Sequence, residues 1–320
     1  MTSNLGKTHS QSEISIAAKS LEEGHLVSFP TETVYGLGAD ACNKEAVARI
    51  YSVKGRPNDH PLIVHIHSIV GLAPWVMQPP EYALQLANAL WPGPMTLILK
   101  RSSLAQDFIT GGQESVGIRV PNHPKALALL AFFYELGGKG IVAPSANRFG
   151  GVSPTTAKAV KDEIQQYLTA QDLIIDGGDC EIGIESTIID CTDDNPIILR
   201  SGAITKDMIF KCTGLEVHEI SSNPIRVSGS LESHYSPKAV VILNRSPISG
   251  EGFIALEKHE TPVGVIRLAA PKDDAEFARC LYSALHEADV RDIATVVVEQ
   301  PEGIGIAIAI RDRLQRASKK

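Results

Sequence analysis

The stretch YSVKGRPNDHPLIVHI, residues 51–66, places two cations on a turn-rich loop directly before an apolar strand. Lys54 and Arg56 flank Gly55, and Pro57 follows at once. A solvated loop explains these charges, because most Lys and Arg side chains stay in water. The alternative is a phosphate site, in which Lys54 acts as a point charge and Arg56 as a planar fork. Taken alone, the loop favours the solvated interpretation, so other segments must decide.

The bulk composition is that of an ordinary globular protein. The length of 320 residues predicts two domains or one large one. The hydrophobic fraction of 43% and the charged fraction of 21% are typical of a globular domain. The net charge of −7 argues against a broad nucleic-acid surface. The five cysteines form no C-x-x-C pair, which indicates reduced thiols rather than disulfides or a zinc site. A polar N-terminus and the lack of a long apolar run predict a cytoplasmic protein without membrane association.

Hydrophobic periodicity predicts an α/β fold. Strands are expected at HLVSFP, PLIVHI, MTLILK, SVGIRV, GIVAP, DLIID, STIID and PIILR. Helices are expected within residues 14–24, 43–51, 79–90, 123–136, 153–165 and 205–212. Several of these strands follow one another directly. We therefore expect a twisted, mixed sheet with helices packed on it, rather than a purely doubly wound fold.

A change in composition divides the chain. Residues 214–238 contain few core-type residues and many turn formers, which predicts a linker between a main domain over 1–213 and a small domain over 239–320. The small domain is expected to be Rossmann-like, with strands at AVVILN, TPVGVIRL and IATVVVE. Its last segment, GIGIAIAIRDRLQR, alternates like a strand, but the rhythm of the fold favours a helix. The chain has no G-x-G-x-x-G, so we infer no bound dinucleotide.

Polar side chains gather where the predicted strands end. FPTETVYGLGADA (29–41) joins a strand to a helix through small and hydroxyl residues, and a structural turn explains its glycines better than its Thr33. Arg119 lies in the otherwise apolar SVGIRV, where it needs either a structural ion pair or a substrate carboxylate. Ser145 and Asn147 follow GIVAP, and Arg200 ends PIILR. Ligands of α/β sheets bind at such strand ends, so these side chains predict a common site.

The remaining motifs, and the motifs that the sequence lacks, limit the reaction types that the site can catalyse. His65 alternates into the strand LIVHI, where a lone histidine is more often a core residue than a ligand. The sequence has neither a P-loop nor an evident nucleophile–base pair, and no His, Cys or Asp cluster has metal-binding spacing. A site rich in cations and hydrogen-bond donors suits phosphoryl or nucleotidyl transfer, because positioning and charge neutralisation supply most of that catalysis.

Together these segments resemble the YrdC-type L-threonylcarbamoyladenylate synthases in their long two-domain form. The resemblance rests on FPTETVYGLGADA, KGRPNDHPLIVHI, WPGPMTLIL, VGIRVPNHP, APSANRFGGVSPT, IESTIID, ILRSGAI and SHYSP, which span residues 25–237. Lys54-x-Arg56 and Ser145-x-Asn147 match the family's paired K-x-R and S-x-N signature. The resemblance implies a YrdC-like catalytic domain over 1–213, a linker or lid over 214–238 and a smaller Rossmann-like domain over 239–320.

The resemblance also implies a reaction. L-threonine, bicarbonate or CO2, and ATP would form threonylcarbamoyl-AMP and pyrophosphate. This product would feed the N6-threonylcarbamoyl modification of adenosine 37 in tRNAs, completed by a separate transferase complex. Mg²⁺ would arrive with ATP rather than on a metal site of the protein, and no tightly bound organic cofactor is expected. Direct tRNA binding is expected to be weak or absent.

Site residues follow from the same resemblance. Lys54 and Arg56 are the expected catalytic residues. Contacts to ATP are expected from Lys54, Arg56, His60, Ser115, Ala143, Ser145, Asn147, Ser153, Arg200 and Tyr235. Contacts to L-threonine are expected from Thr33, His65, Arg119 and Ser186. His234 and Tyr235 of SHYSP are the expected lid contacts, although the chain lacks the Pro-Gly-Met-Lys-Tyr run of some members.

Two other functions stay open at this point. One is an RNA-binding module of the YrdC type, which the acidic net charge and the lack of an Arg–aromatic pattern disfavour. The other is a related carbamoyltransferase or hydrogenase-maturation enzyme. Those proteins carry additional acylphosphatase or zinc-finger domains, for which this chain has no matching segment.

Overall fold

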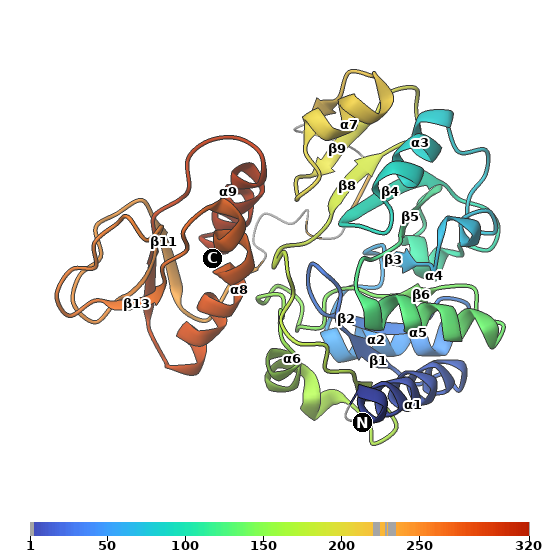
Figure 1. Ribbon diagram of the computed structural model, residues 1–320, viewed down its shortest axis with the longest axis horizontal. Coiled ribbons are helices and arrows are strands. Elements are labelled where there is room, and N and C mark those ends of the chain that lie inside the picture. Colours follow the sequence, from blue (N-terminus) through green and yellow to red (C-terminus); the bar gives the residue numbers. More distant parts are fainter. Residues whose placement is uncertain (1–2, 220–224, 228, 230–234, 320) are drawn as a thin grey trace.

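A ten-stranded mixed sheet forms the larger of two α/β units in the computed structural model, which describes residues 3–219, 225–227, 229 and 235–319 (Figure 1). The strand order is β10-β9-β8-β4-β5-β3-β6-β2-β1-β7. The strands are β1 Val27–Phe29, β2 Gly36–Asp40, β3 Ile63–His65, β4 Met95–Lys100, β5 Ser115–Arg119, β6 Ile141–Val142, β7 Leu173–Ile174, β8 Thr187–Asp190, β9 Ile197–Arg200 and β10 His218–Glu219. Because parallel pairs such as β3/β5 and antiparallel pairs such as β4/β5 share the sheet, the predicted mixed α/β fold is confirmed.

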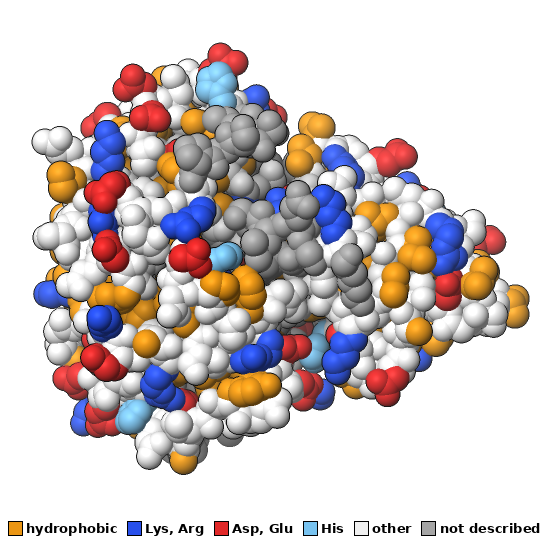
Figure 2. Space-filling model, turned by 180° about the vertical axis from the view of Figure 1, so that it is seen from behind, with side chains coloured by type: hydrophobic (Ala, Val, Ile, Leu, Met, Phe, Trp, Pro, Cys, Tyr) orange, Lys and Arg blue, Asp and Glu red, His pale blue; other side chains and the backbone are white. Residues whose placement is uncertain are grey.

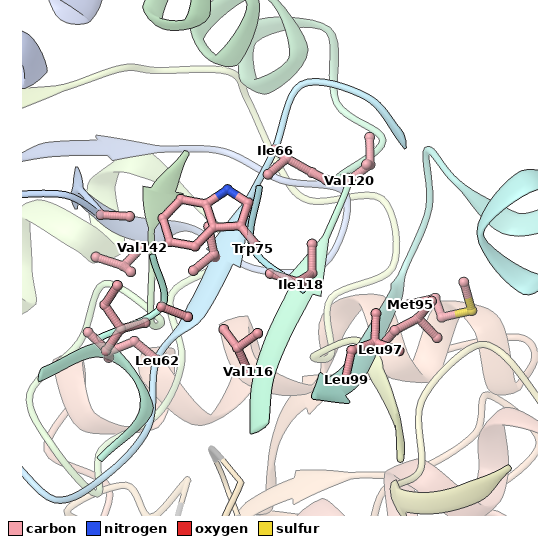
Figure 3. Packing of buried hydrophobic residues seen from close by; sticks show 14 of the residues in the cluster. Leu62, Ile66, Trp75, Met95, Leu97, Leu99, Val116, Ile118, Val120 and Val142 are labelled. Atoms are coloured by element: carbon pink, nitrogen blue, oxygen red, sulfur yellow. The ribbon is translucent and has the colours of Figure 1, made fainter. Parts of the chain in front are cut away.

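One face of this sheet is closed by the main hydrophobic core. Val116 and Ile118 of β5 pack there with Leu97 of β4 and with Trp75 (Figure 3). Helices α2 Lys44–Lys54, α3 Glu81–Leu90, α4 Asp107–Thr110, α6 Ala157–Ile164 and α7 Lys206–Thr213 lie in the same unit, with short 3-10 turns at Ile69–Gly71 and Gln165–Tyr167. Each large apolar side chain buried here contributes about 1.5–3 kcal/mol to folding.

The opposite face is divided into an apolar part and a polar part. Helices α1 Ser3–Glu22 and α5 Pro124–Glu135 cover the apolar part, where Leu21, Leu129 and Phe133 pack near Phe29. Because side chains alternate along a strand, β5 presents Ser115, Gly117 and Arg119 to this face. The polar part therefore lies over the middle strands of the sheet.

The smaller unit has four parallel strands in the order β11-β14-β12-β13. Its strands are β11 Val240–Leu243, β12 Gly252–Ile254, β13 Ile266–Ala269 and β14 Thr295–Val298, and its helices are α8 Asp274–Val290 and α9 Ile306–Ala317. Both helices lie between the small sheet and the larger unit (Figure 1). The helical interpretation of GIGIAIAIRDRLQR is confirmed, because Ala307, Ile310 and Leu314 of α9 are buried at helical spacing.

Several short elements differ from the sequence predictions. FPTETVYGLGADA contains strand β2, which pairs with both β1 and β6, rather than only a connection from a strand to a helix. Gly38 explains why glycines occur there, since an added Cβ would lie 2.8 Å from Phe29 and 2.9 Å from Ile141. Strand β12 was not predicted, and β10 lies within the range 214–238. The helix expected from residue 153 begins at Ala157, capped by Thr156. Among the described residues, no helix is both long and apolar enough to span a bilayer.

We expect Leu97→Ala to lower the free energy of unfolding by about 2–5 kcal/mol, because Leu97 is completely buried in β4 and the shortened side chain leaves a cavity. Urea titration measures this change. Ile248→Ala is the control, because Ile248 is 64% exposed. Equal losses in the two variants would contradict the described core.

Candidate active site

A small cleft with a cavity volume of about 50 Å³ lies over the polar part of the main sheet. Its wall brings together segments that are far apart in the sequence. The lining residues are Val34, Arg56, Ile63, His65, Arg119, Ala143, Pro144, Ser145, Glu185, Ser186, Arg200, Gly229 and Tyr235. Among the predicted site residues, those in this wall are Arg56, His65, Arg119, Ala143, Ser145, Ser186, Arg200 and Tyr235.

Sheet register places Arg119 at the centre of this wall. Arg119 is paired with His65 across β3/β5 and with Thr96 across β4/β5. Its guanidinium forms an ion pair with Glu32 Oε1 at 2.8 Å and donates from Nη2 to Thr33 Oγ1 at 2.9 Å. The buried cation thus has the structural partner that one sequence interpretation required. It also lines the cleft, as the substrate-binding interpretation required.

His65 is buried beside Arg119 and stays neutral. Burial, together with the neighbouring Arg119 charge, lowers the pKa of His65 from 6.5 to about 3. The ring meets Phe29 edge-on, with centroids 6.1 Å apart. Its Nδ1 has no hydrogen-bond partner among the described residues. A neutral imidazole keeps one acceptor nitrogen, so His65 can take a hydrogen bond from a ligand.

Ser186 connects this part of the cleft to Arg200. The Ser186 and Thr96 hydroxyl groups are 2.8 Å apart. Arg200 donates from Nε to the Ser186 carbonyl and from Nη2 to Ser186 Oγ, each at 3.1 Å. Burial lowers the pKa of Arg200, as expected for a guanidinium removed from water. The network holds the Arg200 guanidinium at the cleft wall.

The loop after α2 brings a third guanidinium to the cleft. Gly55 ends α2 with φ 62°, a left-handed conformation that glycine adopts without strain. Arg56 then turns back, donates from Nη2 to the Pro61 carbonyl at 2.9 Å and lies 5.9 Å from the Phe149 ring centroid. Burial lowers the pKa of Arg56 to about 10, so it remains a cation at neutral pH.

The ammonium group of Lys54 points to backbone carbonyls and not into the cleft, where a phosphate ligand was expected. Its Nζ donates to the carbonyls of Ser145 and Asn147, each at 2.5 Å, and the side chain is 2% exposed. Burial, with the nearby charge of Arg56, lowers the pKa of Lys54 well below its usual range. In this structure Lys54 fastens the loop that carries Ser145, and it does not belong to the cleft wall. Its direct contact with ATP stays a prediction.

The other predicted residues lie around the cleft rather than in its wall. These are Thr33, His60, Ser115, Asn147 and Ser153. The Asn147 amide donates to the carbonyls of Arg148 and Gly151, so it shapes the loop. His60 stands edge-on to Phe149, and Ser115 lines a neighbouring hollow. His234 lies outside the described residues.

Sequence reasoning noted two carboxylates of this site within their motifs but assigned a role to neither. Glu32 is the buried partner of Arg119, and Glu185 lines the cleft. The only sequence signal was their presence in FPTET and IESTIID, since nothing in the linear chain shows which cation each one meets. No group of three or more His, Cys, Asp or Glu side chains among the described residues is arranged to hold a metal ion.

Two protein-family models match the chain, one over most of the larger unit and one over a range that includes the smaller unit. Residues 19–202 match the Sua5_yciO_yrdC family model, described as "Telomere recombination", and residues 204–319 match the "Threonylcarbamoyl-AMP synthase, C-terminal domain". The chain is 40% identical to the threonylcarbamoyl-AMP synthase of Pyrococcus abyssi, over 96% of this chain and 94% of the relative. It is 37% identical to that of Bacillus subtilis, over 96% and 93%. The crystal structure of P. abyssi Sua5 complexed with L-threonine matches with a TM-score of 0.85 at 36% identity, over 96% of this chain and 94% of that one.

Because the pKa of His65 is lower in the folded than in the unfolded chain, the free energy of unfolding depends on pH. The unfolded chain takes up a proton near pH 6.5, whereas folded His65 does so only near pH 3. The associated stability is therefore present above pH 6.5 and is lost as the pH falls from 6.5 towards 3. Between pH 7.5 and 5.5 we expect wild-type protein to lose about 1 kcal/mol more stability than His65→Gln, measured by urea unfolding. The same pH dependence in both proteins would contradict a buried neutral His65.

Proposed function

The chain belongs to the family of threonylcarbamoyl-AMP synthases, and we propose that it joins L-threonine, bicarbonate or CO2, and ATP into threonylcarbamoyl-AMP and pyrophosphate. The relatives are named for this product, threonylcarbamoyl-AMP. Its formation from ATP is a nucleotidyl transfer. One observation carries the assignment of the site. Arg56, Arg119 and Arg200 come from three distant segments and line one cleft. Such a concentration of cations fits an amino-acid carboxylate and a triphosphate.

The part of the cleft around Arg119 suits L-threonine. The Arg119 Nε makes no hydrogen bond within the described residues, and a guanidinium fork matches a carboxylate. His65 and Ser186 offer polar atoms for the threonine hydroxyl. A pocket built for that hydroxyl rejects valine by up to about 10⁴-fold, because its own polar groups would otherwise stay unpaired. The P. abyssi relative was crystallised with L-threonine, which supports this assignment.

The part around Arg56, Ser145 and Arg200 suits the nucleotide. In the proposed reaction, the neutral threonine amine attacks CO2 and loses a proton, or attacks bicarbonate with loss of water, to form a carbamate. The carbamate oxygen then attacks the α-phosphorus of ATP as pyrophosphate leaves. Negative charge on the phosphates rises throughout, and the two guanidiniums can offset it. Mg²⁺ would arrive bound to the phosphates of ATP. Tyr235 lines the same wall, which supports its predicted place in a lid that keeps water from the acyl-adenylate.

We infer that the protein supplies an activated intermediate for tRNA modification and does not itself bind tRNA tightly. The mixed anhydride would pass to a separate transferase complex for the N6-threonylcarbamoyl modification of adenosine 37. Basic and acidic side chains are interspersed on the face drawn in Figure 2, whereas a nucleic-acid surface usually carries a basic stripe.

The reaction is tested by mixing the protein with Mg-ATP, L-threonine and labelled bicarbonate. We expect pyrophosphate only from the complete mixture, with the label in a nucleotide adduct. Salt-sensitive, high-affinity tRNA binding without any ATP chemistry would instead support an RNA-binding module.

Arg56→Ala is expected to slow pyrophosphate release at least about 10-fold, because a charge-assisted contact to the phosphates is lost. Its thermal unfolding should remain close to that of wild type. Arg291→Ala is the matched control, since that guanidinium is 45% exposed and pairs with Glu287 on α8. Wild-type pyrophosphate release by Arg56→Ala would remove Arg56 from the mechanism.

Arg119→Lys tests the carboxylate site while leaving a cation for Glu32. A lysine cannot form the bidentate contact that a guanidinium makes with a carboxylate, so we expect the KM for L-threonine to rise about 10-fold to 100-fold. Steady-state pyrophosphate release gives this value, and circular dichroism checks the fold. An unchanged KM for threonine in the folded variant would show that the carboxylate binds elsewhere.

A further inference from the structure

Arg313 on α9 is completely buried, although arginine is rarely removed from solvent without partners. Most of its contacts reach outside its own unit. Nε donates to Glu185 Oε2 at 2.9 Å, and Nη2 donates to the Ser201 carbonyl at 2.9 Å. The guanidinium also lies 5.3 Å from the centroid of the Tyr235 ring. A single side chain of the smaller unit therefore contacts three segments beside the cleft.

The two residues that Arg313 hydrogen-bonds are adjacent in sequence to Ser186 and Arg200 of the cleft wall. Glu185 precedes Ser186, and Ser201 follows Arg200. Ser186 and Arg200 are in turn joined by two hydrogen bonds. Arg313 therefore fixes both backbone segments that present this hydrogen-bonded pair to the cleft.

Glu185 is held as a carboxylate by three hydrogen-bond donors. Its Oε1 accepts from Ser153 Oγ at 2.7 Å, and its Oε2 accepts from Tyr282 Oη at 2.9 Å as well as from Arg313. Burial alone would raise the pKa of Glu185, but the charges of Arg313 and Arg200 and the hydrogen bonds outweigh it and hold the pKa at about 2. A carboxylate with so low a pKa is a weak proton acceptor, and the geometry indicates that the charge of Glu185 anchors Arg313.

Tyr235 is held from two sides by the same unit. Its ring stacks on Tyr282 of α8, with centroids 5.7 Å apart, and Arg313 lies over it. Tyr235 is 1% exposed and has φ 62°, so packing holds it in an uncommon backbone conformation. The smaller unit thus provides the surface on which this cleft residue rests.

We propose that Arg313 is a positioning residue of the reaction, which orients Arg200 and Tyr235 toward the nucleotide by clamping Glu185 and Ser201. This inference rests on the proposed function. It gives the smaller unit a role in completing the site, beyond attachment to the larger unit. Arg313 itself is not in the cleft wall, so it acts through the residues it holds.

The test uses the full chain and the variants Arg313→Lys and Arg313→Met/Glu185→Gln. The double variant removes the charges of Arg313 and Glu185 together, so that neither is left buried without the other. Asp312, the other carboxylate that pairs with Arg313, keeps its ion pair with Arg316. Arg311→Met is the matched control, because Arg311 lies on the same helix and, among the described residues, donates to the Pro301 and Gly303 carbonyls of its own unit. Calorimetry with Mg-ATP gives the Kd for the nucleotide, and thermal unfolding checks the fold.

We expect the Kd for ATP to rise about 10-fold or more in the double variant, by a smaller factor in Arg313→Lys, and not at all in Arg311→Met. A purely structural role would reduce the fraction of folded protein without changing the Kd of the folded fraction. An unchanged Kd in the folded double variant would overturn the proposal. Pyrophosphate formation by wild-type protein is measured separately, and its absence would contradict the proposed function. The role of Arg313 is decided by the ratio of the Kd for ATP in the double variant to that in wild type.

Discussion

The cleft depends on a concentration of buried positive charge, because the guanidiniums of Arg56, Arg119 and Arg200 all line its wall. Arg119 pairs with Glu32, whereas Arg56 donates to the Pro61 carbonyl and Arg200 to Ser186. Burial lowers the pKa values of Arg56 and Arg200. An anionic ligand beside these guanidiniums favours their charged form. The site therefore gains most from ligands that carry a carboxylate or phosphates, as L-threonine and ATP do.

Strand alternation is what allows this site to exist on a stable sheet. In β5, Val116 and Ile118 enter the core, whereas Ser115, Gly117 and Arg119 face the other side. The same period of two sends Val64 of β3 into the core and His65 to the cleft. A one-residue slip of either strand would exchange core and cleft residues, so hydrophobic burial on one face also fixes the register of the site on the other.

Much of this arrangement could be predicted from local pattern, and the rest depends on contacts distant in sequence. Periodicity identified the strands that carry His65, Arg119 and Arg200, and the family resemblance gathered them into one site. The sequence could not show that Lys54 would turn to the carbonyls of Ser145 and Asn147, because both orientations suit a loop lysine. Nor could it pair Glu185 with Arg313, which lies 128 residues away. Strand β12 was missed because its short segment GFI follows the turn-forming SGE and is soon followed by the polar EKHE, whereas the equally short β3 lies within the longer apolar run PLIVHI.

The most direct test of the account is calorimetric titration of the wild-type protein with L-threonine and with Mg-ATP, each alone and each in the presence of the other. The account predicts saturable binding of one molecule of each ligand per chain, with threonine preferred over valine. A protein that binds neither ligand, alone or together, would contradict the account, because its buried arginines would then have no anionic substrate to hold.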